Sequence, residues 1–292
     1  MPEGKYLFFL GCVIPYRVPS YEISARKVCE KLDIQLVEMP EFNCCGLPLD
    51  PVNHDMMLAL AARNLCLAER VGLPIVTLCN GCAGTLRKVN RRLKSDKGLK
   101  EKVNCYLKEI GMEFKGTTEA KHFIQVLAED IGLEKLKKIV QKPFEKLQVA
   151  EHYGCHLLRP LKEIGFENPE DPKVLKKLIE ITGAKCLDYA DETECCGATI
   201  VGINSEIPLM LTREKLHRVK EAGAQALITI CPSCHLMFDT NQPRIERKFG
   251  EKIDLPVLHY PQLLALTVGI NPEDLALKEH KIDASEKIVL FC

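Results

Sequence analysis

Cysteine is the residue type in this chain with the clearest capacity for chemistry. The chain has 292 residues, of which 15 are cysteine, and ten of these form a pattern that occurs twice. Each copy has a single cysteine, then an adjacent pair followed by glycine, then two cysteines separated by two residues. The first set is Cys12, Cys44, Cys45, Cys79 and Cys82, and the second is Cys155, Cys195, Cys196, Cys231 and Cys234. Thiolates bind metals, so the repeat predicts two metal centres of one kind.

The number of thiols in each set bears on the kind of metal. A structural zinc ion takes four ligands in a tetrahedron, whereas each set offers five. Adjacent side chains such as those of Cys44 and Cys45 diverge, which suits two metal atoms better than one. An iron–sulfur cluster has this property, and a regular cubane takes four cysteines. Either one cysteine of each set is spare, or the cluster is not a regular cubane. Zinc binding and metal-free thiol redox chemistry remain alternative hypotheses.

Composition excludes several other classes of protein. Lys plus Arg and Asp plus Glu both number 40, so bulk charge does not favour nucleic-acid binding. The sequence lacks the ferredoxin cysteine run and the motifs G-x-G-x-x-G, Walker A and H-E-x-x-H. It has no apolar stretch long enough for a membrane helix, and no export signal. We therefore expect a cytoplasmic protein whose thiols stay reduced, with no nucleic-acid or membrane partner.

Short apolar runs alternate with helical patterns along both halves of the chain. Strands are predicted at 6–12, 34–39 and 73–79 in the first half, and at 146–155, 184–190 and 225–231 in the second. Helices are predicted from Ser20, at 54–71, after Cys82, and at 172–183 and 205–223. Residues 100–148 are expected to be mostly helical. Strands that alternate with helices in this way form parallel sheets.

The predicted fold is therefore α/β, with two pseudo-symmetric Rossmann-like lobes built on parallel sheets. The expected divisions are a first lobe with a helical extension at 1–145, a second lobe at 146–270 and a C-terminal extension at 271–292. Four cysteines fall at the carboxyl ends of predicted strands, where open α/β sheets place their sites. They are Cys12, Cys79, Cys155 and Cys231.

These motifs resemble the CCG-domain family, in which a cysteine, a CCG triplet and a CxxC pair recur at similar spacing. Over nearly the whole chain the sequence resembles the B subunits of heterodisulfide reductase from methanogenic archaea. The resemblance rests on YLFFLGCVIPYRVPSYE, FNCCGLP, HYGCHLLRP, ETECCGA, CPSCHLMF and LPVLHYPQLLALTVGI. Related CCG domains also serve as electron-relay subunits of lactate, glycolate or succinate oxidoreductases, which is the alternative function.

The resemblance implies an activity, cofactors and partners. Each five-cysteine set would hold a noncubane [4Fe–4S] cluster, giving two [4Fe–4S] clusters. The chain would be the catalytic subunit of an oxidoreductase that reduces the coenzyme M–coenzyme B heterodisulfide to two thiols. Electrons would arrive through a ferredoxin-like C subunit and a flavin-containing A subunit, fed by a hydrogenase or a formate dehydrogenase. Two clusters that flank one S–S bond could each deliver one electron, and thiol–disulfide exchange is the competing mechanism.

A substrate that carries a sulfonate and a phosphate would need anion contacts. The candidates are Arg17, in the loop after Cys12, and three residues beside cluster cysteines, namely His156, Arg159 and His235. The alternative is that all four are ordinary loop or cap residues.

The other cysteines and one basic segment lie outside the repeat. Cys29, Cys66, Cys105 and Cys186 are predicted to be small buried side chains, and Cys292 to be a stray or partner-facing thiol. Residues 87–102 contain eight basic and two acidic residues. They form either a solvated helix face or a docking surface for an acidic partner.

Overall fold

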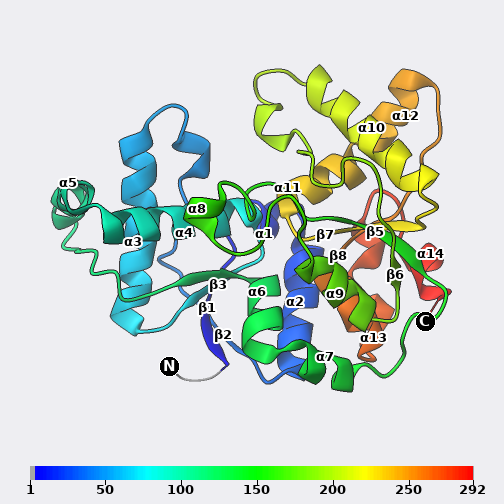
Figure 1. The fold of residues 1–292 in the computed structure, drawn as a ribbon, viewed down its shortest axis with the longest axis horizontal. Helices are drawn as coiled ribbons and strands as arrows, with labels where there is room; N and C mark the ends of the chain where they lie inside the picture. The colour runs from blue at the N-terminus through cyan, green and yellow to red at the C-terminus, as the bar shows by residue number, and fades with distance from the viewer. Residues whose placement is uncertain (1–3, 292) are drawn as a thin grey trace.

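Two parallel four-stranded sheets form the framework of the protein, as the alternating pattern predicts (Figure 1). The computed structural model describes residues 4–291. The first sheet has the order β2 (Gln35–Val37), β1 (Lys5–Phe9), β3 (Ile75–Thr77), β4 (Ala120–His122). The second has the order β6 (Lys185–Cys186), β5 (Gln148–His152), β7 (Ala226–Thr229), β8 (Val257–His259). The two sheets therefore share one topology, and the α/β class with two similar lobes is confirmed.

The fourth strand of each sheet is the main difference from the sequence prediction. Residues 100–148 are helical over about half of their length, and they also contain β4, which completes the first sheet beside β3. β8 does the same beside β7. Each of these strands has only three residues, and β4 contains the charged Lys121. Segments so short do not show a strand periodicity.

Helices of the first lobe follow the strands in order. They are α1 (Ile14–Arg17), α2 (Pro19–Lys31), α3 (His54–Val71), α4 (Asn80–Ser95), α5 (Lys97–Lys108), α6 (Phe123–Gln125), a π-helical segment at Val126–Ile131, and α7 (Leu133–Ile139). The bounds of α3 match the prediction. Its first turn is capped because the Asn53 side chain accepts a hydrogen bond from the Met56 amide, and it ends at Gly72, whose φ is 72°.

The second lobe repeats this arrangement with shorter helices. They are α8 (Leu161–Ile164), α9 (Val174–Ile181), α10 (Glu206–Glu221), α11 (Pro232–His235), a π-helical segment at Leu236–Thr240, α12 (Gln242–Phe249), α13 (Tyr260–Thr267) and α14 (Ser285–Val289). No helix among residues 4–291 combines the length and the apolar character needed to cross a bilayer.

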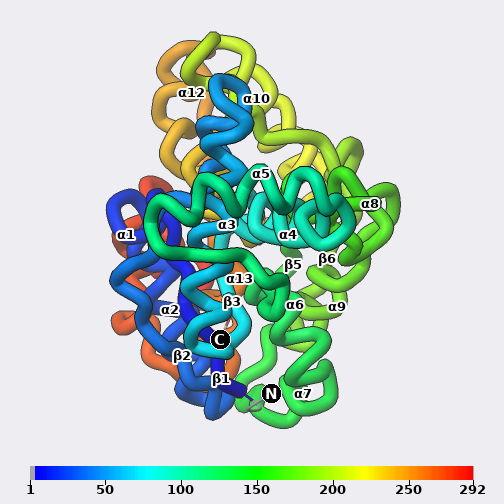
Figure 2. The backbone as a smooth tube through the Cα atoms, turned by 90° about the vertical axis from the view of Figure 1, so that its left-hand side faces the viewer, coloured from blue at the N-terminus to red at the C-terminus, as the bar shows by residue number. Residues whose placement is uncertain are grey.

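The lobes exchange helices across their interface. α13 of the second lobe packs against α2 of the first, and α7 of the first packs against α9 of the second. α8 packs on α4, which lies in one helical layer with α3 and α5 (Figure 2). The Tyr21 hydroxyl of α2 also donates a hydrogen bond to the Ile230 carbonyl, 3.0 Å away. Both lobes therefore contribute to one continuous buried core.

The basic segment at 87–102 takes part in this interface. The Arg87 guanidinium donates to the Ile164 carbonyl at 3.0 Å, and Arg91 donates to the carbonyls of Lys162 and Glu163. These carbonyls lie at the end of α8, where backbone oxygens lack helical partners. Arg87 and Arg91 thus join α4 to the second lobe, which explains part of the charge excess.

Cysteines outside the repeat are buried, with one exception. Cys29, Cys66 and Cys186 are buried as predicted. The prediction for Cys105 is wrong, because that thiol is exposed on α5. Only Val103 and Leu107 of that helix are buried, so Cys105 lies on its outer face. Cys292 lies outside the described residues.

Candidate metal centre

Nine of the ten repeat cysteines line a single cavity between the lobes. The cavity has a volume of about 670 Å³, and its cysteines are Cys12, Cys45, Cys79, Cys82, Cys155, Cys195, Cys196, Cys231 and Cys234. The tenth, Cys44, is partly exposed next to Cys45. All ten thiols are free. The fold therefore brings together two sets that lie far apart in the chain.

Strand ends and helix starts position the CxxC pairs. Cys79 follows β3 by two residues and is the N-cap of α4, whose first turn contains Cys82. Cys231 and Cys234 have the same relation to β7 and α11. Residues three apart lie on one face of a helix, so both thiols of each pair face the cavity. The free amides at a helix start favour negatively charged sulfur.

The CCG loops have the same geometry in both lobes. Gly46 and Gly197 have left-handed backbones, with φ of 92° and 81°. Their amides donate hydrogen bonds to the Sγ atoms of Cys44 and Cys195, at 3.4 and 3.3 Å. A Cβ at Gly46 would come within 2.9 Å of the Met57 carbonyl oxygen. Glycine is thus required both for the turn and for the close approach of the following helix.

The two sets of thiols also contact each other. The thiol of Cys79 interacts with the thiol of Cys231 in the other lobe, and both are buried. Within the second set, the Sγ atoms of Cys155 and Cys195 are 3.9 Å apart. A molecule in the cavity can therefore lie against both sets at once.

Hydrogen bonds among the thiols shift their pKa values in opposite directions. Bonds from the Cys44 and Cys82 thiols lower the pKa of Cys45 to about 3, and bonds from Cys155 and its neighbours lower the pKa of Cys195 to about 2. The same bonds raise the pKa of Cys44, Cys82 and Cys155 above the ordinary value of a thiol. Further thiolates would repel one another in a buried space, and a bound cationic centre would offset this repulsion.

The spacing of the sulfur atoms does not fit a single zinc ion held by thiolates alone; the group of possible ligands that includes these thiols is His152, Cys196 and Cys234. In a tetrahedral zinc site with Zn–S bonds of about 2.3 Å, the sulfurs lie about 3.8 Å apart. Among residues 4–291, no three of these sulfur atoms lie within 4.8 Å of one another. Five thiols spread around a larger space fit an iron–sulfur cluster, whose irons are themselves separated.

The residues predicted to contact substrate lie in three different places. His156 lines the cysteine cavity, and its Nδ1 atom is 3.5 Å from the Cys155 sulfur. The Arg159 guanidinium instead donates to the carbonyls of Thr193 and Pro169, so it holds the loop before the second CCG motif. Arg17 and His235 line a separate cavity of about 340 Å³.

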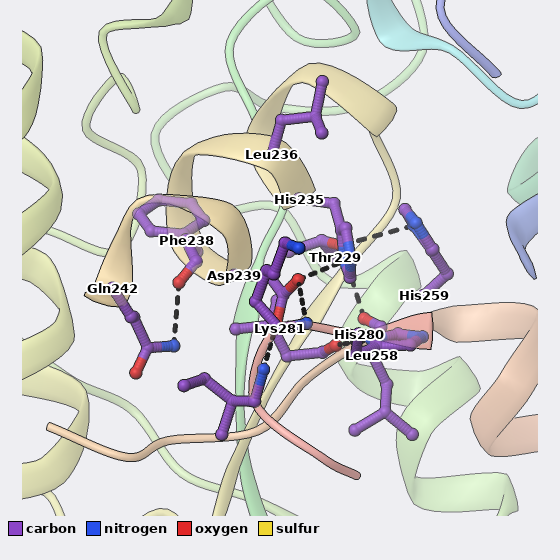
Figure 3. Close-up of polar contacts among 12 residues, drawn as sticks. Thr229, His235, Leu236, Phe238, Asp239, Gln242, Leu258, His259, His280 and Lys281 are labelled. Carbon is purple, nitrogen blue, oxygen red and sulfur yellow. Dashed lines mark hydrogen bonds and ion pairs between the residues drawn. The ribbon is translucent and has the colours of Figure 1, made fainter. Parts of the chain in front are cut away.

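His235 and His280, which line this second cavity, belong to a buried histidine cluster. Figure 3 shows the polar contacts of this cluster. The His235 ring stacks on His259 at 4.1 Å and lies edge-on to His280 at 4.8 Å. The Asp239 carboxylate accepts hydrogen bonds from the backbone amides of Lys281 and Ile282. The predicted C-terminal extension is thus anchored on the second lobe.

Two buried polar residues beside the second set are not predicted by the motifs. His152 is fully buried at the end of β5, and one of its ring nitrogens lies within 4.8 Å of the sulfurs of Cys196 and Cys234. Burial lowers the pKa of His152 to about 3, so the ring is neutral. Lys215 of α10 is also buried, and burial lowers its pKa to about 8. The available signal for His152 was a histidine near the carboxyl end of a predicted strand, three residues before Cys155.

A comparison with protein families gives one match. The cysteine-rich CCG domain matches at residues 6–87 and 149–239, which together make up more than half of the chain. The two matched regions each contain one complete set of five cysteines.

Comparison with curated proteins gives relatives that match along most of their length. The B subunit of the ferredoxin/F420H2-dependent CoB-CoM heterodisulfide reductase of Methanosarcina acetivorans is 41% identical over 97% of this chain and 95% of its own. The B subunit of the ferredoxin:CoB-CoM heterodisulfide reductase of Methanosarcina mazei is 40% identical over the same shares. The 8-methylmenaquinol:fumarate reductase membrane anchor subunit of Wolinella succinogenes is 32% identical over 97% of this chain and 99% of its own.

Among solved structures, a hypothetical protein from Helicobacter pylori has the same fold. Its crystal structure matches with a TM-score of 0.79 and 17% identity, over 97% of this chain and 53% of that one.

Proposed function

The chain belongs to the cysteine-rich CCG-domain family that includes heterodisulfide reductase B subunits, and we propose that it is the catalytic subunit of such a reductase. These relatives imply an iron–sulfur subunit of an oxidoreductase. The proposed substrate is the coenzyme M–coenzyme B heterodisulfide. Two electrons and two protons convert its S–S bond into two thiols, one on each coenzyme.

One observation carries this proposal, namely that nine thiols drawn from both sets line one cavity. The cavity of about 670 Å³ is lined by thiols of both lobes, and Cys79 and Cys231 interact across it. A disulfide placed there would have one set near each sulfur. A duplicated electron wire would need only a short distance between its centres, not a shared space large enough for a ligand.

Each set is proposed to hold one [4Fe–4S] cluster of noncubane type. Five thiols per set exceed the four corners of a regular cubane, and adjacent cysteines such as Cys44 and Cys45 suit neighbouring irons. When bound, such clusters would supply one electron each, which is the electron pair that cleavage of the S–S bond requires.

The protein's own groups would hold and orient this assembly. Amides at the starts of α4 and α11 and at Gly46 and Gly197 favour thiolates over thiols. The buried walls exclude water, which strengthens these interactions. His156, on the wall beside Cys155, is a candidate contact for an anionic group of the substrate. The other three candidates lie away from this wall: Arg17 and His235 line the second cavity, and Arg159 binds carbonyls of a loop.

Electrons must be delivered by a partner in this scheme. The sequence contains no ferredoxin run and no nucleotide-binding glycine motif, so the two five-cysteine sets are its only recognisable redox sites. The proposed partners are a ferredoxin-like C subunit and a flavin-containing A subunit, supplied by a hydrogenase or formate dehydrogenase. The M. acetivorans and M. mazei relatives are named as B subunits, which supports the presence of other subunits without identifying them.

Turnover by the isolated chain tests the proposal. Anaerobically purified protein should contain about eight irons and eight sulfides, four of each per cluster, and should reduce the heterodisulfide with a reduced viologen as donor. Cys79→Ser should abolish turnover, whereas Cys105→Ser, on the exposed face of α5, should not change it. Iron-replete protein without heterodisulfide reduction would refute the assignment.

A trapping experiment separates the two mechanisms. Reduced protein is mixed with substrate, quenched with an alkylating agent and analysed by mass spectrometry. Thiol–disulfide exchange would leave half of the substrate bonded to a protein cysteine. The two-centre scheme predicts no such adduct, and finding one would refute that scheme.

An electron-relay role is the second candidate function. The match to a menaquinol:fumarate reductase subunit over 97% of this chain favours it. A relay would contain the same clusters and exchange electrons with redox partners, yet it would leave the heterodisulfide unchanged. The turnover assay therefore decides between the two functions.

A further inference from the structure

The two lobes differ in polarity at equivalent positions beside their thiol sets. Phe9 pairs with Thr77 at the end of β1, and His152 pairs with Thr229 at the end of β5. Each is followed three residues later by the single cysteine of its set, Cys12 or Cys155. The first lobe thus has a hydrocarbon ring where the second has an imidazole.

His152 has no hydrogen-bond partner, although it is fully buried. Neither its Nδ1 nor its Nε2 atom meets a donor or acceptor. Burying an imidazole in this state costs stability unless the ring finds a partner that the protein atoms do not supply. Its ring lies edge-on to Phe238 at 4.7 Å, and one of its nitrogens lies within 4.8 Å of the Cys196 and Cys234 sulfurs. The missing partner is therefore expected among the sulfur atoms of the second centre.

A second difference lies on the helix behind each CCG loop. Asn64 of α3 and Lys215 of α10 both follow the CCG glycine by 18 residues. The Asn64 amide donates to the Cys44 carbonyl at 3.1 Å, and the Lys215 ammonium donates to the carbonyls of Asp191 and Glu192 at 2.6 and 3.1 Å. Both side chains thus brace the loop before the cysteine pair, but only Lys215 brings a positive charge.

We propose that the two iron–sulfur centres are not equivalent, because His152 donates an N–H hydrogen bond to the sulfur shell of the second centre and Lys215 adds a nearby positive charge. Both groups stabilise the more negative, reduced state. The second centre therefore has the higher reduction potential, and the first electron delivered resides there. This inference rests on the proposed clusters and deepens the proposed function.

Direct ligation of iron by His152 is less consistent with the repeat. The second set already has five thiols, the same number as the first, where the equivalent residue is Phe9 and cannot bind metal. Hydrogen bonds to sulfur and local charge are established determinants of cluster potential. One effect opposes the inference, because Cys12 is exposed whereas Cys155 is partly buried. This difference in exposure involves one thiol of five, whereas the His152 donor and the Lys215 charge both act on the buried part of the second set.

Redox titration of the whole protein, followed by EPR, tests the inference with a matched pair of variants. His152→Leu and Phe9→Leu place the same side chain at equivalent positions, and only the first removes a donor. Wild-type protein should show two potentials. His152→Leu should lower the higher potential by at least about 59 mV, which is a tenfold change in the one-electron reduction equilibrium. Phe9→Leu should leave the difference between the two potentials unchanged. His152→Gln, which keeps an N–H donor, should restore part of the shift, and Lys215→Asn should lower the same potential.

The outcomes that overturn the inference are specific. Unchanged potentials in iron-replete His152→Leu, or a shift of the lower potential, would overturn it. So would loss of one cluster in both His152→Leu and His152→Gln, or a strong coupling to directly bound ¹⁵N-histidine in pulsed EPR, since these assign His152 as a ligand. Wild-type protein without clusters would overturn this inference and the proposed function together. The expected shift without heterodisulfide turnover would refute only the function.

Discussion

Replacing Gly84 by alanine should destabilise the contact between the lobes. Gly84 lies buried in α4, and a Cβ built there would be 2.3 Å from the carbonyl oxygen of His156 and 3.5 Å from Ile164 Cδ1. The opposing atom belongs to the backbone, so it cannot rotate away. To restore an ordinary van der Waals distance between the new Cβ and this oxygen, α4 and the segment at His156 must separate by roughly 1 Å.

The net effect combines two opposing contributions. Overpacking in a buried site costs about 1–3 kcal/mol, while alanine gains up to ~1 kcal/mol over glycine inside a helix. We expect a net loss of about 1–2 kcal/mol, which lowers Tm by about 2–8 °C for a chain of this size. Because His156 lies beside Cys155 on the cavity wall, the displacement should also reduce turnover while iron content stays the same.

Gly98→Ala is the matched control. Gly98 is exposed on α5, and an added Cβ there would meet only the Asp96 side chain, at 3.6 Å. This variant should be neutral or up to ~1 kcal/mol more stable than wild type. The measurements are thermal and urea unfolding of anaerobic protein, together with viologen-linked turnover. Equal Tm values for the two alanine variants would show that the lobes are not in the close contact described.

Three further changes test other parts of the structure. Cys231→Ser should leave about half of the iron and sulfide, since only the second set loses a ligand; a full complement of metal would contradict the assignment of this cysteine. Asn80→Ala removes the 2.7 Å hydrogen bond from Asn80 to the Tyr153 carbonyl across the lobes, and should cost about 1–2 kcal/mol in urea unfolding. Burial raises the pKa of Glu151, whose Oε2 atom has no partner, so the folded state binds a proton that the unfolded state releases above pH ~4.5, and stability should fall as pH rises beyond this value. Glu151→Gln should reduce that fall in stability. The measurement is the urea midpoint at pH 5 and at pH 8, and an equal change in wild type and variant would exclude a contribution from Glu151.

The sequence was most informative where chemistry and periodicity acted together. Cysteine spacing grouped ten residues into two sets, and nine of them do line one cavity. The helix at His54–Val71 was predicted with its bounds, and the structure shows that Asn53 caps its start and that it ends at Gly72. The positions of Cys79 and Cys231 followed from the rule that sites lie at the carboxyl ends of parallel strands.

Features set by tertiary contacts could not be predicted in this way. Strand β4, at Ala120–His122, is too short for a periodic signal and forms because β3 offers it an edge. Arg17 follows Cys12 closely, yet the short helix α1 places it at the second cavity. Arg159 carries the charge expected of an anion contact, but nearby carbonyls already occupy its guanidinium. Spacing along the chain does not specify the direction of a side chain after a turn.

The exchange of helices between the lobes has a consequence for the origin of the chain. In both contacts a helix that comes after the fourth strand of one lobe (α13 or α7) packs against the helix between the first two strands of the other (α2 or α9), as the two halves of a symmetric dimer interface do. A single ancestral unit of this design would assemble as a homodimer with its two thiol sets facing each other across the twofold axis. Symmetry would then force both halves to be identical. Gene fusion removes that constraint, and each half can acquire its own residues around the cavity that the two halves share.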